Sequence, residues 1–305
     1  MNIRMQEISK RHYSPLRRVL CAQFILLWIF LSPGEGISES KSWTKTEGTK
    51  VTIGLLEQQL TQLSGDARET ARGLGKTALP ILSKHFRSES KRERALVLEC
   101  LGEVQGDEAV LILVEALKDP EPDVWNTALD LLHTVHSPVS VEPLTRLLAE
   151  SSQPRIRGEI ARILGRMKAA SALPALKNQI QKESDPDATR KIDLAIASLE
   201  DGPARRRVVE RLANPNSKLR YQAIGDIEYV NDPGLIGKLL PLLDDESRVV
   251  NVGIEKWPVW HRVCDRAVEA VVSLSGKALP FPTGKKTYSK DQIQQARDRI
   301  KEVSR

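Results

Sequence analysis

The sequence predicts an all-α protein: an α-solenoid of about six to seven helical hairpins, with an insertion before the last hairpin and a C-terminal capping helix. Two observations predict this fold. Aromatic residues make up only 4% of the 305 residues, which suits stacked helices with small contact residues better than a β-sandwich. Amphipathic stretches also end on similar dipeptides at a near-constant spacing, and such a period is the signature of a solenoid.

Seven dipeptides close the first helix of each predicted hairpin. They are Leu74-Gly75, Leu101-Gly102, Leu132-His133, Leu164-Gly165, Ile196-Ala197, Ile227-Glu228 and Val271-Val272. The first six stand roughly 27, 31, 32, 32 and 31 residues apart, and an insertion precedes the seventh. Four residues before each closing position the side chain is apolar, except at Asp193. The i, i+3, i+4 stripe of an amphipathic helix therefore repeats in register.

A second helix is expected to follow each first helix. Pro80, Pro143 and Pro174 lie at or near the start of such helices, where a missing N–H costs nothing. Between hairpins, proline stands beside Asp, Ser or Asn, as in Asp185-Pro186-Asp187. The proline ends one helix and the polar residue caps the next. Each hairpin buries only one face by itself, so we expect the hairpins of residues 54–247 to stack.

Two segments carry a recognisable pattern, residues 102–110 (Gly-Glu-Val-Gln-Gly-Asp-Glu-Ala-Val) and residues 156–165. The first resembles the consensus of short HEAT-like repeats of the phycobilisome-lyase type, and the second is similar to the first-helix consensus of the same repeats. The resemblance covers roughly residues 66–244 and returns more weakly at 263–275. It implies the solenoid fold. It implies no single function, because such repeats serve adaptors, lyases, hydroxylases and glycosylases alike.

Residues 1–36 have the pattern of a secretory signal peptide. A basic region ends at Arg17-Arg18, an uncharged apolar run follows, and the breaker Ser32-Pro33-Gly34-Glu35-Gly36 closes it. The run is shorter than the about 20 residues that a transmembrane helix needs. An uncleaved membrane anchor and a buried core helix are the alternatives. Residues 37–53 are predicted to be a polar linker. We expect an exported chain, periplasmic or extracellular, with no membrane span in its mature form.

The net charge of +6 does not by itself predict a nucleic-acid partner. Residues 1–36 contain five basic and two acidic residues, so about half of the excess lies there. The remaining surface is only mildly basic, which differs from a phosphate-binding footprint. The basic cluster Arg155, Arg157, Arg162 and Arg166 is interspersed with acids such as Glu159, and we expect it to be a solvated face.

Catalytic, cofactor-binding and metal-binding residues are not predicted. Gly75-Lys76-Thr77 lacks the earlier glycine of a phosphate-binding loop. His133 and His136 are three residues apart but have no third ligand nearby. The HEAT-like hydroxylases that this fold resembles use His-Glu dyads, and no His-Glu dipeptide occurs here. Cys100 and Cys264 fall in apolar helical patterns about five hairpins apart, too far for a disulfide.

Two features are candidates for contact with a protein partner. Arg205, Arg206 and Arg207 open a second helix, and second helices usually line the concave side of such solenoids. Trp257 and Trp260 lie in the insertion 248–262, whose beginning favours an extended strand, and tryptophan is enriched at binding hot spots. That loop either binds a partner or covers the end of the stack. Residues 263–305 hold the final hairpin and a capping helix with Ser289 as its N-cap.

These observations favour an exported, non-catalytic scaffold that binds a protein partner through the concave face of a helical solenoid. Two alternatives stay open. One is a lyase-like or other enzyme built on a HEAT-like fold, and the other is a nucleic-acid-binding HEAT-like protein.

Overall fold

The computed structural model describes residues 45–200, 202–251, 259–284 and 287–303. The predicted signal peptide and Trp257 lie outside the described residues. The chain divides into two compact units, Met1–Gly48 and Thr49–Arg305, and the description that follows concerns the second. In the described part of the chain, no helix is long and apolar enough to span a bilayer.

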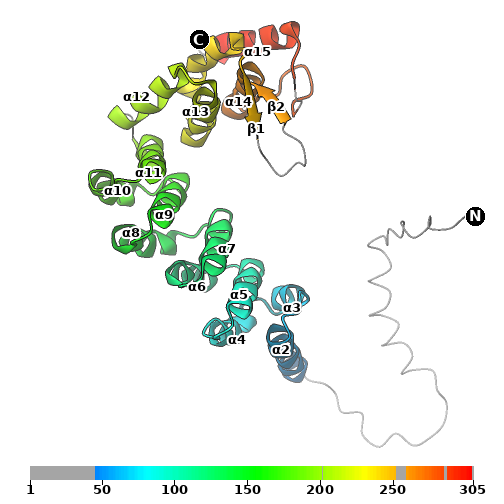
Figure 1. The fold of residues 1–305 in the computed structure, drawn as a ribbon. Coiled ribbons are helices and arrows are strands. Elements are labelled where there is room, and N and C mark those ends of the chain that lie inside the picture. The colour runs from blue at the N-terminus through cyan, green and yellow to red at the C-terminus, as the bar shows by residue number, and fades with distance from the viewer. Residues whose placement is uncertain (1–44, 201, 252–258, 285–286, 304–305) are drawn as a thin grey trace, which may run out of the picture. The chain divides into compact units, whose positions relative to one another are not determined.

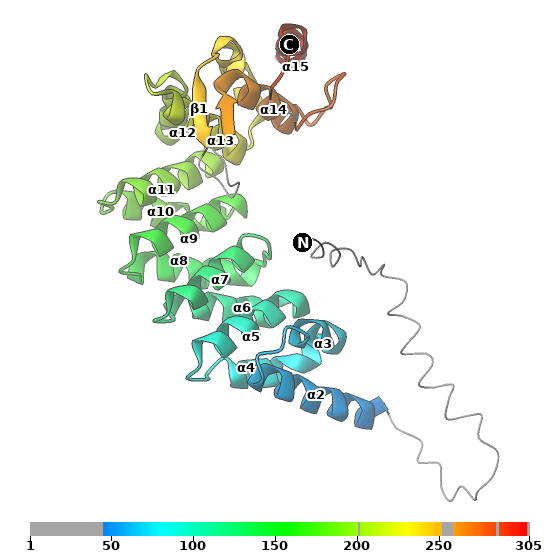
Figure 2. The same ribbon diagram turned by 45° about the vertical axis from the view of Figure 1, so that its right-hand side comes forward.

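The repeated helical hairpins predicted from the sequence are present. The first helices are α3 (Ala67–Leu74), α5 (Lys91–Val104), α7 (Pro122–Leu132), α9 (Pro154–Arg166), α11 (Pro186–Leu199), α13 (Ser217–Val230) and α14 (Val263–Ser275). The second helices are α4 (Leu79–His85), α6 (Asp107–Glu115), α8 (Val141–Glu150), α10 (Leu173–Ile180), α12 (Pro203–Glu210) and the 3-10 helix η7 (Pro233–Asp244). Figures 1 and 2 show the first helices as one row and the second helices as another. The prediction of an α-solenoid is confirmed.

The remaining elements are short turns and the two ends of the stack. The turns are η2 (Gly75–Ala78), η3 (Ala116–Lys118), η4 (Pro138–Ser140), η5 (Ala170–Ala172) and η6 (Arg211–Ala213). Helix α2 (Lys45–Thr61) begins inside the predicted linker 37–53. Leu56 and Leu60, one turn apart, are fully buried, so this polar helix packs against the core through an apolar stripe.

Proline and polar caps mark the helix ends, as the sequence predicts. The side chain of Asp185 accepts a hydrogen bond from the amide of Ala188 at 2.8 Å, and Pro186 begins α11. Ser289 and Gln292 form a reciprocal capping box. The Gln292 amide donates to Ser289 Oγ at 3.3 Å, and the Ser289 amide donates to Gln292 Oε1 at 3.0 Å. This box begins α15 (Lys290–Val303), the predicted capping helix.

Asp193, the one polar residue four positions before a closing dipeptide, is paired with arginines of the following helix. Asp193 is only 1% exposed. Its carboxylate accepts hydrogen bonds from Arg207 and, at 2.6 Å, from Arg211. A buried carboxylate is tolerated when it is paired and hydrogen-bonded, so Asp193 joins α11 to α12 and η6 instead of interrupting the core.

A second ion-pair pattern recurs in every other hairpin. Arg94, Arg157 and Arg220 stand 63 residues apart, each at the fourth position of its first helix. Their Nε atoms lie 2.7 Å from carboxylate oxygens of Asp119, Glu183 and Asp245, respectively. Each of these acids lies in the loop that follows the second helix of the same hairpin. Each guanidinium also donates to a carbonyl in the loop before its own helix. Each arginine therefore clamps two successive loops.

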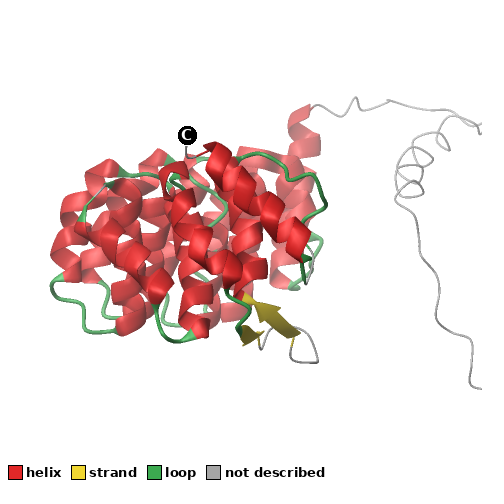
Figure 3. Cartoon of the chain, turned by 90° about the horizontal axis from the view of Figure 1, so that it is seen from above, coloured by secondary structure: helices red, strands yellow, loops and turns green. Residues whose placement is uncertain are grey.

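The C-terminal end departs from the regular repeat. The sixth second helix, η7, is a 3-10 helix, and it contains Pro241, which cannot donate an amide hydrogen bond. The insertion forms an antiparallel pair, β1 (Arg248–Asn251) with β2 (Val259–Arg262), in which Val249 pairs with His261. Figure 3 shows this pair at the rim of the helices. In the last hairpin α14 packs against α15 and η7.

Candidate binding site

Helices α9 and α11 pack unusually closely because glycine faces alanine along their contact. Gly158 and Gly165 are seven residues apart, two turns on one face of α9. A Cβ at Gly158 would lie 3.1 Å from the Cα of Ala188, and one at Gly165 would lie 2.8 Å from the Cα of Ala195. Both distances are shorter than ordinary van der Waals contact, so the two backbones touch where the glycines stand.

Two side chains then tie three successive first helices together. The Tyr229 hydroxyl on α13 passes over Gly165 and donates to the carbonyl of Arg162 on α9 at 2.7 Å, which skips α11. The ammonium group of Lys168, just beyond α9, donates to the carbonyls of Ser198 at 2.9 Å and Val230 at 3.0 Å. These carbonyls belong to the C-terminal ends of α11 and α13. The ends of the three helices therefore converge.

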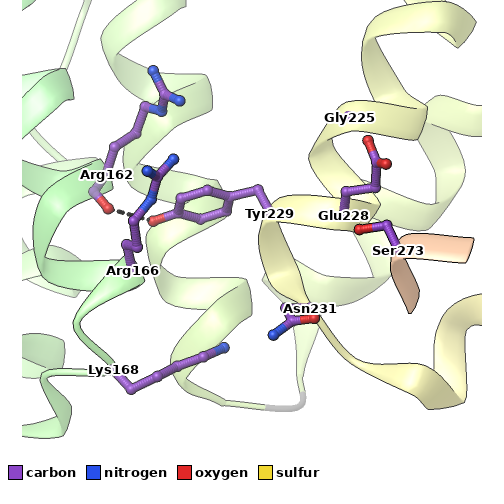
Figure 4. Close-up of a pocket in the computed structure, with 8 residues that line it drawn as sticks. All are labelled: Arg162, Arg166, Lys168, Gly225, Glu228, Tyr229, Asn231 and Ser273. Atoms are coloured by element: carbon purple, nitrogen blue, oxygen red, sulfur yellow. Dashed lines mark hydrogen bonds between the residues drawn. The ribbon is translucent and has the colours of Figure 1, made fainter. Parts of the chain in front are cut away.

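The convergent ends enclose an open cavity of about 550 Å³, which we call the basin. It is lined by Arg162, Arg166, Lys168, Gly225, Glu228, Tyr229, Asn231 and Ser273. Figure 4 shows the Tyr229 ring between the two arginines on one side and Glu228 and Ser273 on the other. The basin thus has a cationic wall from α9, an aromatic centre from α13, and a polar wall from α13 and α14.

The cationic wall is held by an internal carboxylate. Glu159 Oε2 lies 2.9 Å from His133 Nε2 and 3.2 Å from a guanidinium nitrogen of Arg162, and its Oε1 lies 2.9 Å from Lys191 Nζ. Burial raises the pKa of Glu159, but the hydrogen bonds from His133 and Lys191, with the nearby charges, outweigh it and lower the pKa to about 2. Glu159 is therefore an anion that positions Arg162.

Arg166 is an exposed cation of the basin. Among the described residues its side chain makes one hydrogen bond, a long one of 3.4 Å to the His133 carbonyl. On the opposite wall, Glu228 is bound by Arg266, with one nitrogen–oxygen distance of 3.1 Å. Burial raises the pKa of Tyr229, so its hydroxyl stays neutral and keeps its role as donor.

The three arginines predicted to contact a partner lie in different surroundings. Arg205 pairs with Asp232 at 2.7 Å and donates to the Ala197 carbonyl, and Arg207 pairs with buried Asp193. These two side chains hold the fold together. Arg206 is exposed on α12. In residues 154–275, the hydrogen bonds that skip a hairpin join the ends of first helices, as those of Tyr229 and Lys168 do. The first helices therefore converge here. In this part of the stack the inner face is lined by first helices, not by second helices as expected.

The predicted aromatic site is described only in part. Trp260 on β2 is 55% exposed, whereas its neighbour His261 lies with its ring 6.2 Å from that of Tyr221 on α13. One face of the strand pair therefore covers the stack and Trp260 points away from it. Whether the loop binds a partner stays a prediction.

His133, His136, Cys100 and Cys264 lie in capping, ion-paired or buried positions of the fold. His133 caps α7 and pairs with Glu159, while burial, Arg166 and His133 lower the pKa of His136. The structure brings no third candidate ligand to them: within the described ranges no group of three His, Cys, Asp or Glu residues is arranged to hold a metal ion. Cys100 and Cys264 are buried free thiols, and burial raises the pKa of Cys100 to about 12 and that of Cys264 to about 11.

Comparison with known proteins identifies the repeats. The model of the HEAT repeat family matches residues 78–152 and, overlapping them, residues 112–197. A comparison with curated proteins found no match.

Solved structures with a similar fold include three natural proteins. The complex of CpcE and CpcF of phycocyanin lyase from a Nostoc species is 16% identical, covering 89% of this chain and 99% of its own, with a TM-score of 0.47. The E. coli protein YibA is 19% identical (87% and 99% covered, TM-score 0.45). Human deoxyhypusine hydroxylase is 16% identical (85% and 98% covered, TM-score 0.35). At these values the similarities carry no conclusion about activity.

Proposed function

This chain contains HEAT repeats, and from that premise we propose that it is a non-catalytic scaffold that holds a protein partner in the basin at the ends of α9, α13 and α14. The observation that supports this is a rigid backbone that carries exposed hydrogen-bond donors. The basin stands on three first helices tied together by Tyr229 and Lys168. Because these helices are fixed before a partner arrives, little backbone conformational entropy is lost on binding.

The chemistry of the lining favours binding over catalysis. General acid–base work requires a titratable group that is free to exchange a proton with a substrate. The two carboxylates of the basin region are both in ion pairs, Glu228 with Arg266 and Glu159 with Lys191. Apart from Gly225, the remaining lining residues are three cations, the hydroxyls of Tyr229 and Ser273, and the amide of Asn231, and these groups suit recognition of polar groups.

The proposal includes export, which rests on the sequence of residues 1–36. We expect the mature protein to begin after Gly34 or Gly36, which follow the apolar run. N-terminal sequencing of the protein from the exported fraction tests this. An intact N-terminal Met1 on all of the protein would overturn cleavage and favour the membrane-anchored alternative.

A steric block tests the binding surface without changing its charge. Ser273 lines the basin from α14 and is exposed, so Ser273→Tyr should fill the space in front of Tyr229. Asn178 is an exposed residue of the second helix α10, and Asn178→Tyr is the matched control. Wild type and both variants are used as bait under identical conditions, after circular dichroism has shown equal thermal stability.

We expect Ser273→Tyr to lose the protein that wild type captures and Asn178→Tyr to keep it. Retention by Ser273→Tyr with loss by Asn178→Tyr would overturn the proposal in favour of the second-helix face. Failure of wild type to retain any protein specifically, in extracts of the compartment to which it is delivered, would also overturn it.

A further inference from the structure

We propose that the basin recognises an acidic segment of the partner protein, with Arg166 and Arg162 binding its carboxylates. This inference rests on the proposed function and adds the chemistry of the partner. It begins from the donors that the fold leaves unused. A guanidinium has five N–H donors in a fixed fork, and Arg166 contributes a single long contact of 3.4 Å to the structure.

The C-terminal ends of α11 and α13 do not need Arg166 to neutralise them. Cations near a helix C-terminus commonly serve that purpose, because the last carbonyls carry partial negative charge. Here Lys168 already binds the end carbonyls of α11 and α13. Arg166 lies in the last turn of α9, where its charge interacts favourably with the dipole of that helix. Its guanidinium also extends into the basin beside the Tyr229 ring (Figure 4).

Arg162 supplies a second, preorganised cation. It is one turn before Arg166 on the same face of α9, and its guanidinium carbon lies 6.0 Å from the centre of the Tyr229 ring. Glu159 fixes one of its nitrogens at 3.2 Å, while 34% of the side chain is exposed. Two arginines in adjacent turns present paired N–H forks, the geometry that binds carboxylates in a bidentate manner.

The opposite wall favours a peptide over a nucleic acid. A phosphate backbone carries regularly spaced charge and would have to pass Glu228, which lines the same cavity. A peptide can place carboxylates at the arginines and neutral groups elsewhere. The side chains of Asn231 and Ser273 on this wall suit the donors and acceptors of a peptide backbone.

A synthetic acidic peptide tests the proposal directly. The full-length protein is titrated by isothermal calorimetry with hexaglutamate blocked at both ends, with hexaglutamine as the uncharged control, and with a single-stranded thymidine oligonucleotide of equal charge. The variants are Arg166→Glu in the basin and Arg92→Glu on α5. Arg92 is the matched control because it is an exposed helical arginine outside the basin.

We expect hexaglutamate to bind wild type, hexaglutamine not to bind, and Arg166→Glu to weaken hexaglutamate binding at least about tenfold, because a charge-assisted hydrogen bond is lost and repulsion is added. Arg92→Glu should change it less than about twofold. Absence of binding at millimolar hexaglutamate, equal loss in both variants, or tighter binding of the oligonucleotide would each overturn the proposal. If Ser273→Tyr still loses the captured protein but hexaglutamate does not bind, the proposed scaffold function stands and only the proposal of an acidic partner segment is refuted.

Discussion

Gly165 gives the sharpest test of the tie between α9, α11 and α13. In Gly165→Ala the new methyl group would lie 2.2 Å from the Tyr229 hydroxyl, 2.8 Å from the Cα of Ala195 and 2.9 Å from Ser198 Oγ. One of these three neighbours is backbone, which cannot turn aside. Gly102 stands at the equivalent closing position of α5, and there a methyl group would meet only the flexible side chain of Leu131, at 2.7 Å.

The two substitutions therefore differ in energy although their chemistry is the same. Alanine gains up to about 1 kcal/mol over glycine within a helix. At Gly165 this gain is opposed by overpacking of about 1–3 kcal/mol and by loss of the Tyr229 hydrogen bond, about 1 kcal/mol. We expect a net destabilisation of about 1–3 kcal/mol. At Gly102 rotation of Leu131 relieves the contact, so the free energy of unfolding should stay within about 1 kcal/mol of wild type.

Urea unfolding followed by circular dichroism at 222 nm measures both variants against wild type. The double variant Gly165→Ala with Tyr229→Phe adds a second check, because without the hydroxyl the methyl group meets one fewer neighbour. The double variant should be less destabilised than the sum of the two single changes. A Gly165→Ala protein as stable as Gly102→Ala would refute the close approach of α9 and α11.

Three further outcomes follow from buried groups. Asp193→Leu leaves Arg207 and Arg211 without their shared carboxylate and should destabilise the protein in urea unfolding, whereas Arg207→Ala leaves the buried carboxylate paired with Arg211 and should cost about 1 kcal/mol; an Asp193→Leu protein more stable than wild type would contradict the pairing. The hydrogen bond from Arg157 holds the pKa of Glu183 at about 2, below its ordinary 4.5, so the stabilisation is complete above pH 4.5 and is lost as the pH falls towards 2; Glu183→Gln should lose less stability over that range, and an unchanged pH profile would argue against the clamp. The Cys100 thiol, with a pKa raised by burial to about 12, should resist iodoacetamide at pH 8 until urea unfolds the chain, as peptide mapping will show; rapid labelling of the native protein would place the thiol at the surface.

Periodicity in the sequence was sufficient to predict the hairpins, because an amphipathic stripe directly reports which face of a helix is buried. The closing position at Leu74 coincides with the end of α3, and that at Leu132 with the end of α7. The irregular sixth second helix had a visible signal in Pro241. Contacts that skip a hairpin had no signal in the sequence. Tyr229 binds a carbonyl 67 residues away, whereas a repeat pattern reports only neighbouring units.

The basin was visible in the sequence only in fragments. Arg162 and Arg166 were recognised as a basic cluster but interpreted as a solvated face, since sequence alone does not reveal that Tyr229 stands beside them. The sequence also did not show the surroundings of Arg205 and Arg207, and their role in partner binding stays a prediction. These two arginines find acidic partners, Asp232 and Asp193, on other elements. The spacing of Gly158 and Gly165 was the one local signal of close packing in this region.

The arginine clamps at Arg94, Arg157 and Arg220 make two hairpins, not one, the interchangeable segment of this protein. Excising 63 residues between equivalent points of two clamped helices would leave each remaining guanidinium opposite a carboxylate. Excising a single hairpin of about half that length would bring a clamped helix against a loop that lacks its acid. Shortened or lengthened versions of the stack should therefore be built in double steps, with binding surfaces transplanted in the same increments.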